Sequence, residues 1–244
     1  MSTGTSRSYD QVAVVIPAHN EQGHLPLCLR AIVTAALCAP APVKVIVVLD
    51  ASNDGSTELA GRYGPDVHFL RVESRNVGAA RAAGFDYARS LFGQDTRDWY
   101  ATTDADSTVD ADWLLRQLAC DADMFLGLVR VTDWHLHPSE VVERYLKAYD
   151  ARVQDNHDHI HGANMGFSSG AYWRAGGFRA LASGEDVDLV ARFEDAGYRI
   201  HRDTARSVVT SSRTKARAPR GFGDHLSELS GIATDDDVAT GDVA

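Results

Sequence analysis

Cysteine is scarce in this chain, and its scarcity argues against a fold held together by disulfides. The 244 residues include 3 cysteines, Cys28, Cys38 and Cys120, which is an odd and sparse set. Small secreted domains usually carry an even number of paired cysteines. The polar residues 1–10 also lack the apolar core of a signal peptide. We therefore expect a reduced, cytoplasmic compartment.

Positive charge is also in short supply. Lys and Arg number 24 against 34 Asp and Glu, for a net charge of -10. Proteins that bind nucleic acid usually carry a basic face, so no nucleic-acid partner is expected. No apolar run reaches the roughly 20 residues of a membrane-spanning helix. We expect a soluble protein with no transmembrane segment; peripheral membrane contact and the oligomeric state stay open.

Two phosphate-binding signatures are missing as well. The first apolar run, residues 12–16, is not followed by Gly-x-Gly-x-x-Gly, and no Walker lysine motif occurs. Those glycines normally let a dinucleotide pyrophosphate approach a helix N-terminus. A diphosphate bound by this chain would therefore need a metal ion and arginines instead.

What the chain does contain is an alternation of strand-like and helix-like segments. Continuous apolar runs predict buried strands at residues 12–16, 43–49, 67–72, 99–103 and 124–131. Helical spacing predicts helices at 21–37, 57–63, 78–92, 110–120, 139–153 and 185–196, with a short one near Tyr172. Residues 156–170 are expected to form a loop, and 198–201 and 207–210 are strand-like. This order predicts an α/β fold with a mainly parallel, Rossmann-like sheet flanked by helices.

The length suits one domain of this class. We expect a flexible N-terminus at residues 1–10 and a single domain at 11–220. Residues 221–244 are acidic and rich in small residues, and we expect them to be a disordered tail.

Three of the predicted strands run directly into polar segments. These are residues 17–21, residues 50–56 and the triplet Asp104-Ala105-Asp106. The carboxyl ends of parallel strands share one edge of a sheet, which is where ligands bind in open α/β folds. Carboxylates at that edge can hold a hard divalent cation, and the cation can hold a diphosphate. The alternatives are an ordinary turn for the triplet and, for Asp54, a helix cap, which we favour.

Together these motifs resemble the family 2 glycosyltransferases of the GT-A fold. The resemblance rests on residues 16–21 (IPAHNE), 49–57 (LDASNDGST), 104–106 (DAD) and 184–189 (GEDVDL), and it extends over residues 12–213. It implies a nucleotide-binding half at 11–106 and an acceptor half at 107–220. It also implies transfer of a sugar from a nucleotide-diphospho sugar to a hydroxyl of a small or soluble acceptor.

The resemblance assigns residues to the nucleotide. Pro17, Ala18 and Glu21 would line its pocket, and Asp50 would accept a hydrogen bond from the base. Uracil and guanine both offer an imide N–H, so the donor is expected to be UDP- or GDP-linked. Arg81 matches the family's nucleotide-contacting basic motif.

The resemblance also assigns the metal and the diphosphate. Asp106 would bind Mg²⁺ or Mn²⁺, while Asp104, next to Ala105, would contact the ribose or a metal-bound water. A histidine common in the family is absent from residues 209–213 (VTSSR). We therefore expect Arg213, with Lys215, to meet the diphosphate.

Catalysis is assigned to the acidic pair Glu185-Asp186. Asp186 would remove a proton from the acceptor hydroxyl in a single displacement with inversion. His161 and Asn164 would contact the acceptor. The simpler interpretation of Glu185 and Asp186 is that they are first-turn acids interacting with a helix dipole, and the two interpretations are compatible.

Several alternatives stay open. His157, His159 and His161 alternate as zinc ligands might, although acceptor contacts or a polar loop are favoured. The aromatic residues Trp134, Tyr172 and Trp173 belong either to the core or to a sugar-stacking platform. The rival functions are a retaining GT-A transferase that acts on a glycerate-type acceptor and a non-catalytic nucleotide-sugar binding protein.

Overall fold

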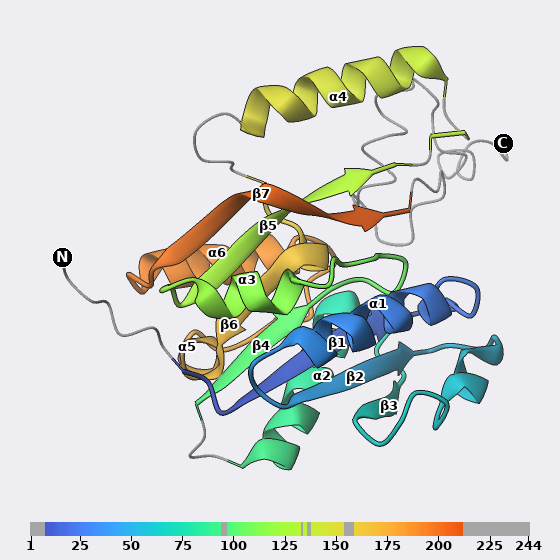
Figure 1. The fold of residues 1–244 in the computed structure, drawn as a ribbon, viewed down its shortest axis with the longest axis vertical. Coiled ribbons are helices and arrows are strands. Elements are labelled where there is room, and N and C mark those ends of the chain that lie inside the picture. Colours follow the sequence, from blue (N-terminus) through green and yellow to red (C-terminus); the bar gives the residue numbers. More distant parts are fainter. Residues whose placement is uncertain (1–7, 94–96, 133, 136–137, 154–158, 212–244) are drawn as a thin grey trace, which may run out of the picture.

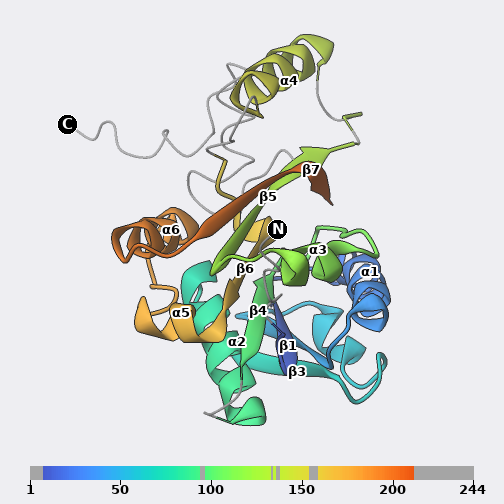
Figure 2. The same cartoon turned by 60° about the vertical axis from the view of Figure 1, so that its left-hand side comes forward.

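The computed structural model describes residues 8–93, 97–132, 134–135, 138–153 and 159–211. These residues form a seven-stranded sheet with helices on both faces (Figures 1 and 2). The expected acidic tail at 221–244 and most of the expected flexible N-terminus lie outside the described residues.

The sheet confirms the predicted α/β class. Its order is β3-β2-β1-β4-β6-β5-β7. Only β6 runs antiparallel to its two neighbours, β4 and β5; every other pair is parallel. The strands are β1 (Gln11–Ala18), β2 (Val43–Asp50), β3 (Val67–Val72), β4 (Asp98–Thr102), β5 (Met124–Val131), β6 (Met165–Ser168) and β7 (Ile200–Thr210).

The helices largely follow the predicted ranges. They are α1 (Leu25–Cys38), α2 (Val77–Phe92), α3 (Trp113–Ala119), α4 (Ser139–Val153), α5 (Ser169–Arg174) and α6 (Glu185–Asp195), with short 3₁₀ turns η1 (Gly55–Leu59) and η2 (Gly162–Asn164). The helix predicted at 57–63 is wrong, because η1 occupies residues 55–59 instead. The capping role of Asp54 is confirmed: its carboxylate accepts a hydrogen bond from the Ser56 amide at 3.0 Å.

Two features of the second half differ from the prediction. The loop expected at 156–170 contains β6, a strand of 4 residues that is too short to show an apolar period. The two strand-like pieces at 198–201 and 207–210 are one strand, β7, whose pairing with β5 shifts register at Gly127 and Leu128. Because a bulge interrupts the alternation, the sequence shows two fragments rather than one strand.

Two hydrophobic cores, one on each face, explain why the central strands are apolar at every position. Val12, Val14 and Ile16 of β1 pack into the core that includes α1 and α3. Ala13 and Val15 point the other way, into the core shared by α2, α5 and α6. A strand covered on both faces needs apolar side chains throughout. Tyr172 is fully buried in the second core, so it is a core residue rather than a sugar platform.

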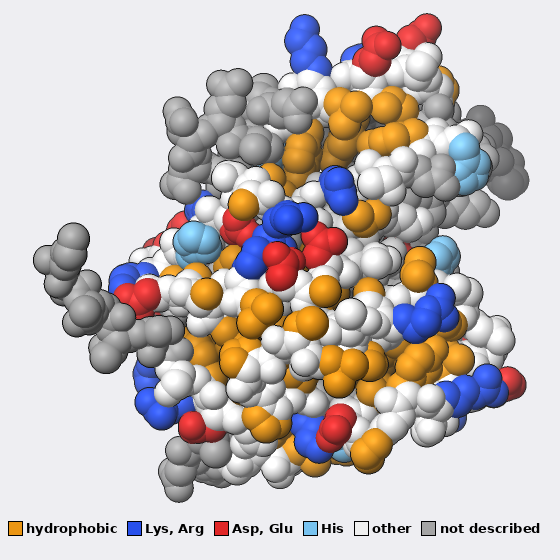
Figure 3. Space-filling model, in the orientation of Figure 1, with side chains coloured by type: hydrophobic (Ala, Val, Ile, Leu, Met, Phe, Trp, Pro, Cys, Tyr) orange, Lys and Arg blue, Asp and Glu red, His pale blue; other side chains and the backbone are white. Residues whose placement is uncertain are grey.

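An ion pair joins α3 to β7. Arg116 contacts Asp203 at 2.6 Å and Asp112 at 3.5 Å. Figure 3 shows a mixed group of acidic and basic side chains near the middle of one face of the molecule. The end of β7 also meets the loop after β4, because the Ser107 and Thr210 hydroxyls lie 3.1 Å apart. In Figures 1 and 2, α4 lies beyond the ends of β5 and β7, apart from the helices that cover the sheet.

The close approach of α2 to the sheet generates a stability prediction. A Cβ added to Gly84 would lie 2.5 Å from Val15 Cγ1 and 2.9 Å from Val48 Cγ2. Gly84→Ala should therefore lower the free energy of unfolding by about 1–3 kcal/mol, because overpacking outweighs the gain in helix propensity. Urea denaturation measures this change. Gly23→Ala, where no atom lies within 4 Å of the new Cβ, is the control, and equal stability of the two variants would contradict the packing argument.

Candidate active site

The loops that follow β1 and β2 are joined by hydrogen bonds. Asn20 Oδ1 accepts from the Asn53 amide at 2.8 Å, and the Gln22 amide donates to Asp54 Oδ2 at 2.8 Å. Three non-glycine residues with positive φ follow successive strands: Asn20 at 52°, Ala51 at 49° and Arg75 at 49°. Such backbone strain persists only where the surroundings hold it, and it is concentrated at functional sites. The backbone at the carboxyl edge of β1, β2 and β3 is therefore held in place by its surroundings, as it is at functional sites.

The residues expected to line a nucleotide pocket lie at this edge. Pro17 and Ala18 are the last residues of β1, where Ala18 is level with Leu49 of β2. The Glu21 carboxylate is buried and lies 2.8 Å from His24 Nδ1. Asp50 ends β2 on the same edge, as the parallel register requires.

The Asp50 carboxylate holds the chain that leads into α2. Its two oxygens accept hydrogen bonds from the backbone amides of Arg75 and Asn76, each at 2.8 Å. Asn76 in turn caps α2 through the Ala79 amide at 2.9 Å. Asp50 is thus an anchor for the positive-φ turn at Arg75, a structural role that the sequence did not reveal.

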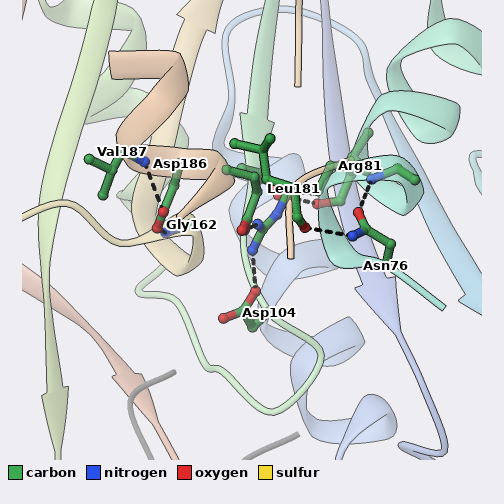
Figure 4. A network of polar contacts seen from close by, with 11 residues as sticks. Asn76, Arg81, Asp104, Gly162, Leu181, Asp186 and Val187 are labelled. Atoms are coloured by element: carbon green, nitrogen blue, oxygen red, sulfur yellow. Dashed lines mark hydrogen bonds and ion pairs between the residues drawn. The ribbon is translucent and has the colours of Figure 1, made fainter. Parts of the chain in front are cut away.

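Arg81 connects the two acidic motifs. Its Nη2 donates to Asp104 Oδ1 at 2.8 Å and its Nη1 donates to Glu185 Oε1, and the residue is only 2% exposed (Figure 4). Burial acts to lower the pKa of the guanidinium, but the carboxylates of Asp104, Glu185 and Asp186 more than offset it, so the pKa is raised above its usual value. Arg81 therefore stays charged while removed from water.

The acidic pair at the start of α6 is divided between two environments. Glu185 is buried against Arg81. Asp186 is half-buried, and its Oδ2 accepts a hydrogen bond from the Gly162 amide at 2.9 Å (Figure 4). Gly184, with φ of 73°, makes the left-handed turn that starts the helix. Of the two carboxylates, Asp186 is the one open to a substrate.

The Asp104-Ala105-Asp106 triplet turns directly after β4. The Asp104 side chain is 38% exposed in spite of its contact with Arg81, and Asp106 is half-buried. Beneath them, burial raises the pKa of the Cys28 thiol, and the carboxylates of Asp106, Asp104 and Glu21 raise it further. Carboxylates that follow β1 and β4 thus lie near the same buried thiol.

This carboxylate set is compatible with a simple divalent-metal site. Within the described ranges, no group of three or more His, Cys, Asp or Glu side chains forms a site that could hold an ion alone. Mg²⁺ commonly binds through one or two carboxylates, with water and substrate phosphates completing its shell. Asp104 and Asp106 fit that pattern as donors.

The two residues expected to contact the acceptor, Asn164 and His161, differ in burial. Asn164 is 1% exposed; its Oδ1 accepts from Trp113 Nε1 at 2.9 Å and its Nδ2 donates to the Leu128 carbonyl at 2.8 Å. Both ends of this amide are used inside the fold. His161 is half-buried, with its ring 5.6 Å from that of His159. His157, Arg213 and Lys215 lie outside the described residues.

The sheet and its acidic edge define an α/β protein of the GT-A fold. A model described as "Glycosyl transferase family 2" matches residues 13–176. The chain belongs to this family, as the motifs predicted.

Part of the chain is similar to curated transferases. The undecaprenyl-phosphate 4-deoxy-4-formamido-L-arabinose transferase of Yersinia enterocolitica is 35% identical over 106 residues, covering 41% of this chain and 30% of the relative. The same-named protein of Sodalis glossinidius is 35% identical over 107 residues, covering 42% and 31%. The matched segment thus spans less than a third of either relative.

Two solved structures share the fold. TarS 1-349 of S. aureus, in complex with UDP-GlcNAc, has a TM-score of 0.63 at 13% identity, over 90% of this chain and 64% of that one. The mannosyltransferase PcManGT of Pyrobaculum calidifontis, in complex with GDP-Man and Mn²⁺, has a TM-score of 0.61 at 20% identity, over 84% and 58%. No helix in the described part of the chain is long and apolar enough to cross a membrane.

The anchoring role of Asp50 can be tested by stability. Asp50→Asn replaces one acceptor oxygen by an amide that cannot accept from Arg75 or Asn76. Hydrogen bonds to charged groups contribute about 1.5–3 kcal/mol, so the free energy of unfolding should fall by about 2 kcal/mol in urea denaturation. Asp66→Asn is the control, because Asp66 is an exposed partner of Lys44 and should change stability by less than about 1 kcal/mol. Unchanged stability in Asp50→Asn would contradict the anchor.

Proposed function

We propose that this protein is a glycosyltransferase that moves a sugar from a nucleotide-diphospho sugar to an acceptor hydroxyl, with inversion at the anomeric carbon. The observation that carries the proposal is the Arg81 guanidinium, which contacts both Asp104 and Glu185. The donor-side acidic motif and the motif containing Asp186 are thereby held at one point of the sheet edge.

On the donor side, the nucleotide would lie along the carboxyl ends of β1 and β2. Pro17, Ala18 and Glu21 would line its pocket, with Asp50 nearest the base. The structural neighbours are in complex with UDP-GlcNAc and with GDP-Man, which supports a UDP- or GDP-linked donor. The scarcity of cysteine, with 3 residues in 244, supports a cytoplasmic location.

Charge balance supports a divalent metal. Arg81 faces the three carboxylates of Asp104, Glu185 and Asp186, and Asp106 adds a fourth. A diphosphate entering this edge would meet net negative charge, which a bound cation offsets. Asp106, with Asp104, would hold Mg²⁺ or Mn²⁺, and the cation would stabilise charge on the departing diphosphate. Arg213 follows the described end of β7 by three residues and is proposed as a further contact to the diphosphate.

On the acceptor side, Asp186 is the proposed general base. The acceptor oxygen attacks the anomeric carbon, its proton passes to the Asp186 carboxylate, and the bond to the diphosphate breaks. A positioned base contributes about 10²- to 10⁴-fold in rate. The hydrogen bond from the Gly162 amide orients the Asp186 carboxylate. His161, the residue before Gly162, is the proposed acceptor contact. The buried amide of Asn164 would act only by holding η2 in place.

A second candidate acceptor is a lipid-linked phosphate. It is favoured by the names of the curated relatives, which are undecaprenyl-phosphate transferases. A phosphate monoester has a second pKa near 6 and is largely ionised at neutral pH. Such an acceptor needs no base, whereas a hydroxyl does. The effect of removing the Asp186 carboxylate therefore separates the two acceptors.

Asp186→Asn should keep nucleotide binding and lower kcat by about 10²-fold or more with a hydroxyl acceptor. Isothermal titration calorimetry with UDP and GDP measures binding. Release of the nucleoside diphosphate from a panel of nucleotide-sugar donors measures turnover. Asp188→Asn, two residues further along the same helix and paired with Arg192, is the control.

Three outcomes would contradict this proposal. Unchanged turnover with a hydroxyl acceptor would exclude Asp186 as the base. A product that keeps the donor's anomeric configuration, determined by NMR, would favour the retaining rival. Tight nucleotide-sugar binding without any transfer would favour the non-catalytic rival.

Asp106→Ala should weaken Mn²⁺-dependent nucleotide binding while leaving metal-free binding near the wild-type level. Loss of the carboxylate removes a ligand that a divalent ion needs to bridge protein and diphosphate. Thermal shift measures the effect, since a ligand at 100 times its Kd stabilises a protein by about 2.7 kcal/mol. An equal Mn²⁺-dependent shift in the variant and the wild type would contradict the metal assignment.

A further inference from the structure

The geometry points to Arg81 as a positioning residue: its guanidinium sets the donor-side Asp104 relative to the acceptor-side Asp186, and it does not bind the nucleotide. This inference rests on the proposed function and deepens it. It also differs from the expectation, implied by family resemblance, that Arg81 contacts the nucleotide.

The guanidinium is buried, and both of its terminal nitrogens are already bonded within the protein. Its Nη1 and Nη2 are hydrogen-bonded to Glu185 and Asp104, and its Nε is buried without a hydrogen-bond partner among the described residues. The Phe178 ring lies 5.5 Å from its central carbon. With 2% of the residue exposed, a diphosphate could reach it only if the groups that cover it moved away.

The groups that Arg81 joins come from distant parts of the chain. Asp104 is 23 residues away, after β4, and Glu185 is 104 residues away, at the start of α6. A guanidinium is a planar fork that can orient two carboxylates at once, whereas an ammonium is a point charge. Because Arg81 and Glu185 are out of water, each costs free energy if the other moves away. The fork therefore fixes both carboxylates in one geometry.

Gly162 extends this control to Asp186. The Gly162 backbone packs so closely on the guanidinium that an added Cβ would overlap it. The amide of the same residue donates to Asp186 Oδ2. The guanidinium thus supports the first turn of α6 through Glu185 and also supports the hydrogen-bond donor to the proposed base.

A separate contact holds α2 against the segment before α6. Asn76 Nδ2 donates to the Leu181 carbonyl at 2.6 Å (Figure 4), and the backbone of Gly78 packs on the Arg179 carbonyl. These contacts do not involve the Arg81 side chain. A change at Arg81 should therefore loosen the site more than the fold.

The test is Arg81→Lys, which keeps the charge but loses the fork. Arg89→Lys is the matched control: it lies two turns later on α2, with its guanidinium over the Trp173 ring at 4.7 Å. In Arg81→Lys we expect kcat to fall by about 10²-fold, as for a misplaced catalytic group. The metal-free Kd for UDP or GDP should stay within about twofold of wild type. Arg89→Lys should match the wild type.

A second measurement does not depend on activity. Hydrogen exchange at the Gly162 amide should speed up by about tenfold or more in Arg81→Lys, because its support is lost, and it should not change in Arg89→Lys. If the wild-type protein transfers no sugar, the proposed function fails, but this measurement still tests the positioning role.

Two results would overturn the inference. One is a weaker metal-free Kd with kcat unchanged, which identifies a direct nucleotide contact. The other is unchanged exchange at Gly162. If Arg81→Lys does not fold, Gly162→Ala decides, because it displaces the guanidinium without removing a charge; full kcat in that variant would overturn the positioning role.

Discussion

The buried guanidinium of Arg81 is the contact on which the candidate site depends. It joins Asp104, which follows a central strand, to Glu185, which begins a helix on one face of the sheet. Taking the Arg81 and Glu185 charges out of water is unfavourable unless they stay paired, so this ion pair disfavours arrangements in which α2 and α6 separate. Asp186, which is half-buried, follows Glu185 directly and accepts a hydrogen bond from the Gly162 amide.

The sheet topology explains how this contact arises. Because β6 inserts antiparallel between β4 and β5, the later strands β5 and β7 still run parallel to the first four. The helix α6 then packs into the same core as α2. Its first turn consequently meets the first turns of α2, where Arg81 lies. Burial of apolar surface alone does not require this contact. Through Arg81, it brings Asp104 and Glu185 together.

Some of the structure could be read from local signals. The apolar runs of β1 and β2 predicted buried strands, since side chains on both faces are covered. The place of Asp54 before a helix predicted at 57–63 predicted its capping role. Other parts carried no local signal. Strand β6 is too short to show a period, β7 is interrupted by a bulge, and the inward amide of Asn164 looks like any polar residue in a loop.

The sequence by itself determined the fold class, the family and the acidic motifs at the carboxyl edge, because these follow from residue order along single strands. Only the tertiary structure decided what those motifs touch. Arg81, which matches a nucleotide-contacting motif, is instead buried between two carboxylates, and Asp50 holds the turn at Arg75 with both of its oxygens. Asp104 and Glu185 lie 23 and 104 residues from Arg81 along the chain. The two residues bonded to the Asp50 carboxylate lie 25 and 26 residues from it. Contacts across such separations depend on packing, which local sequence patterns do not encode.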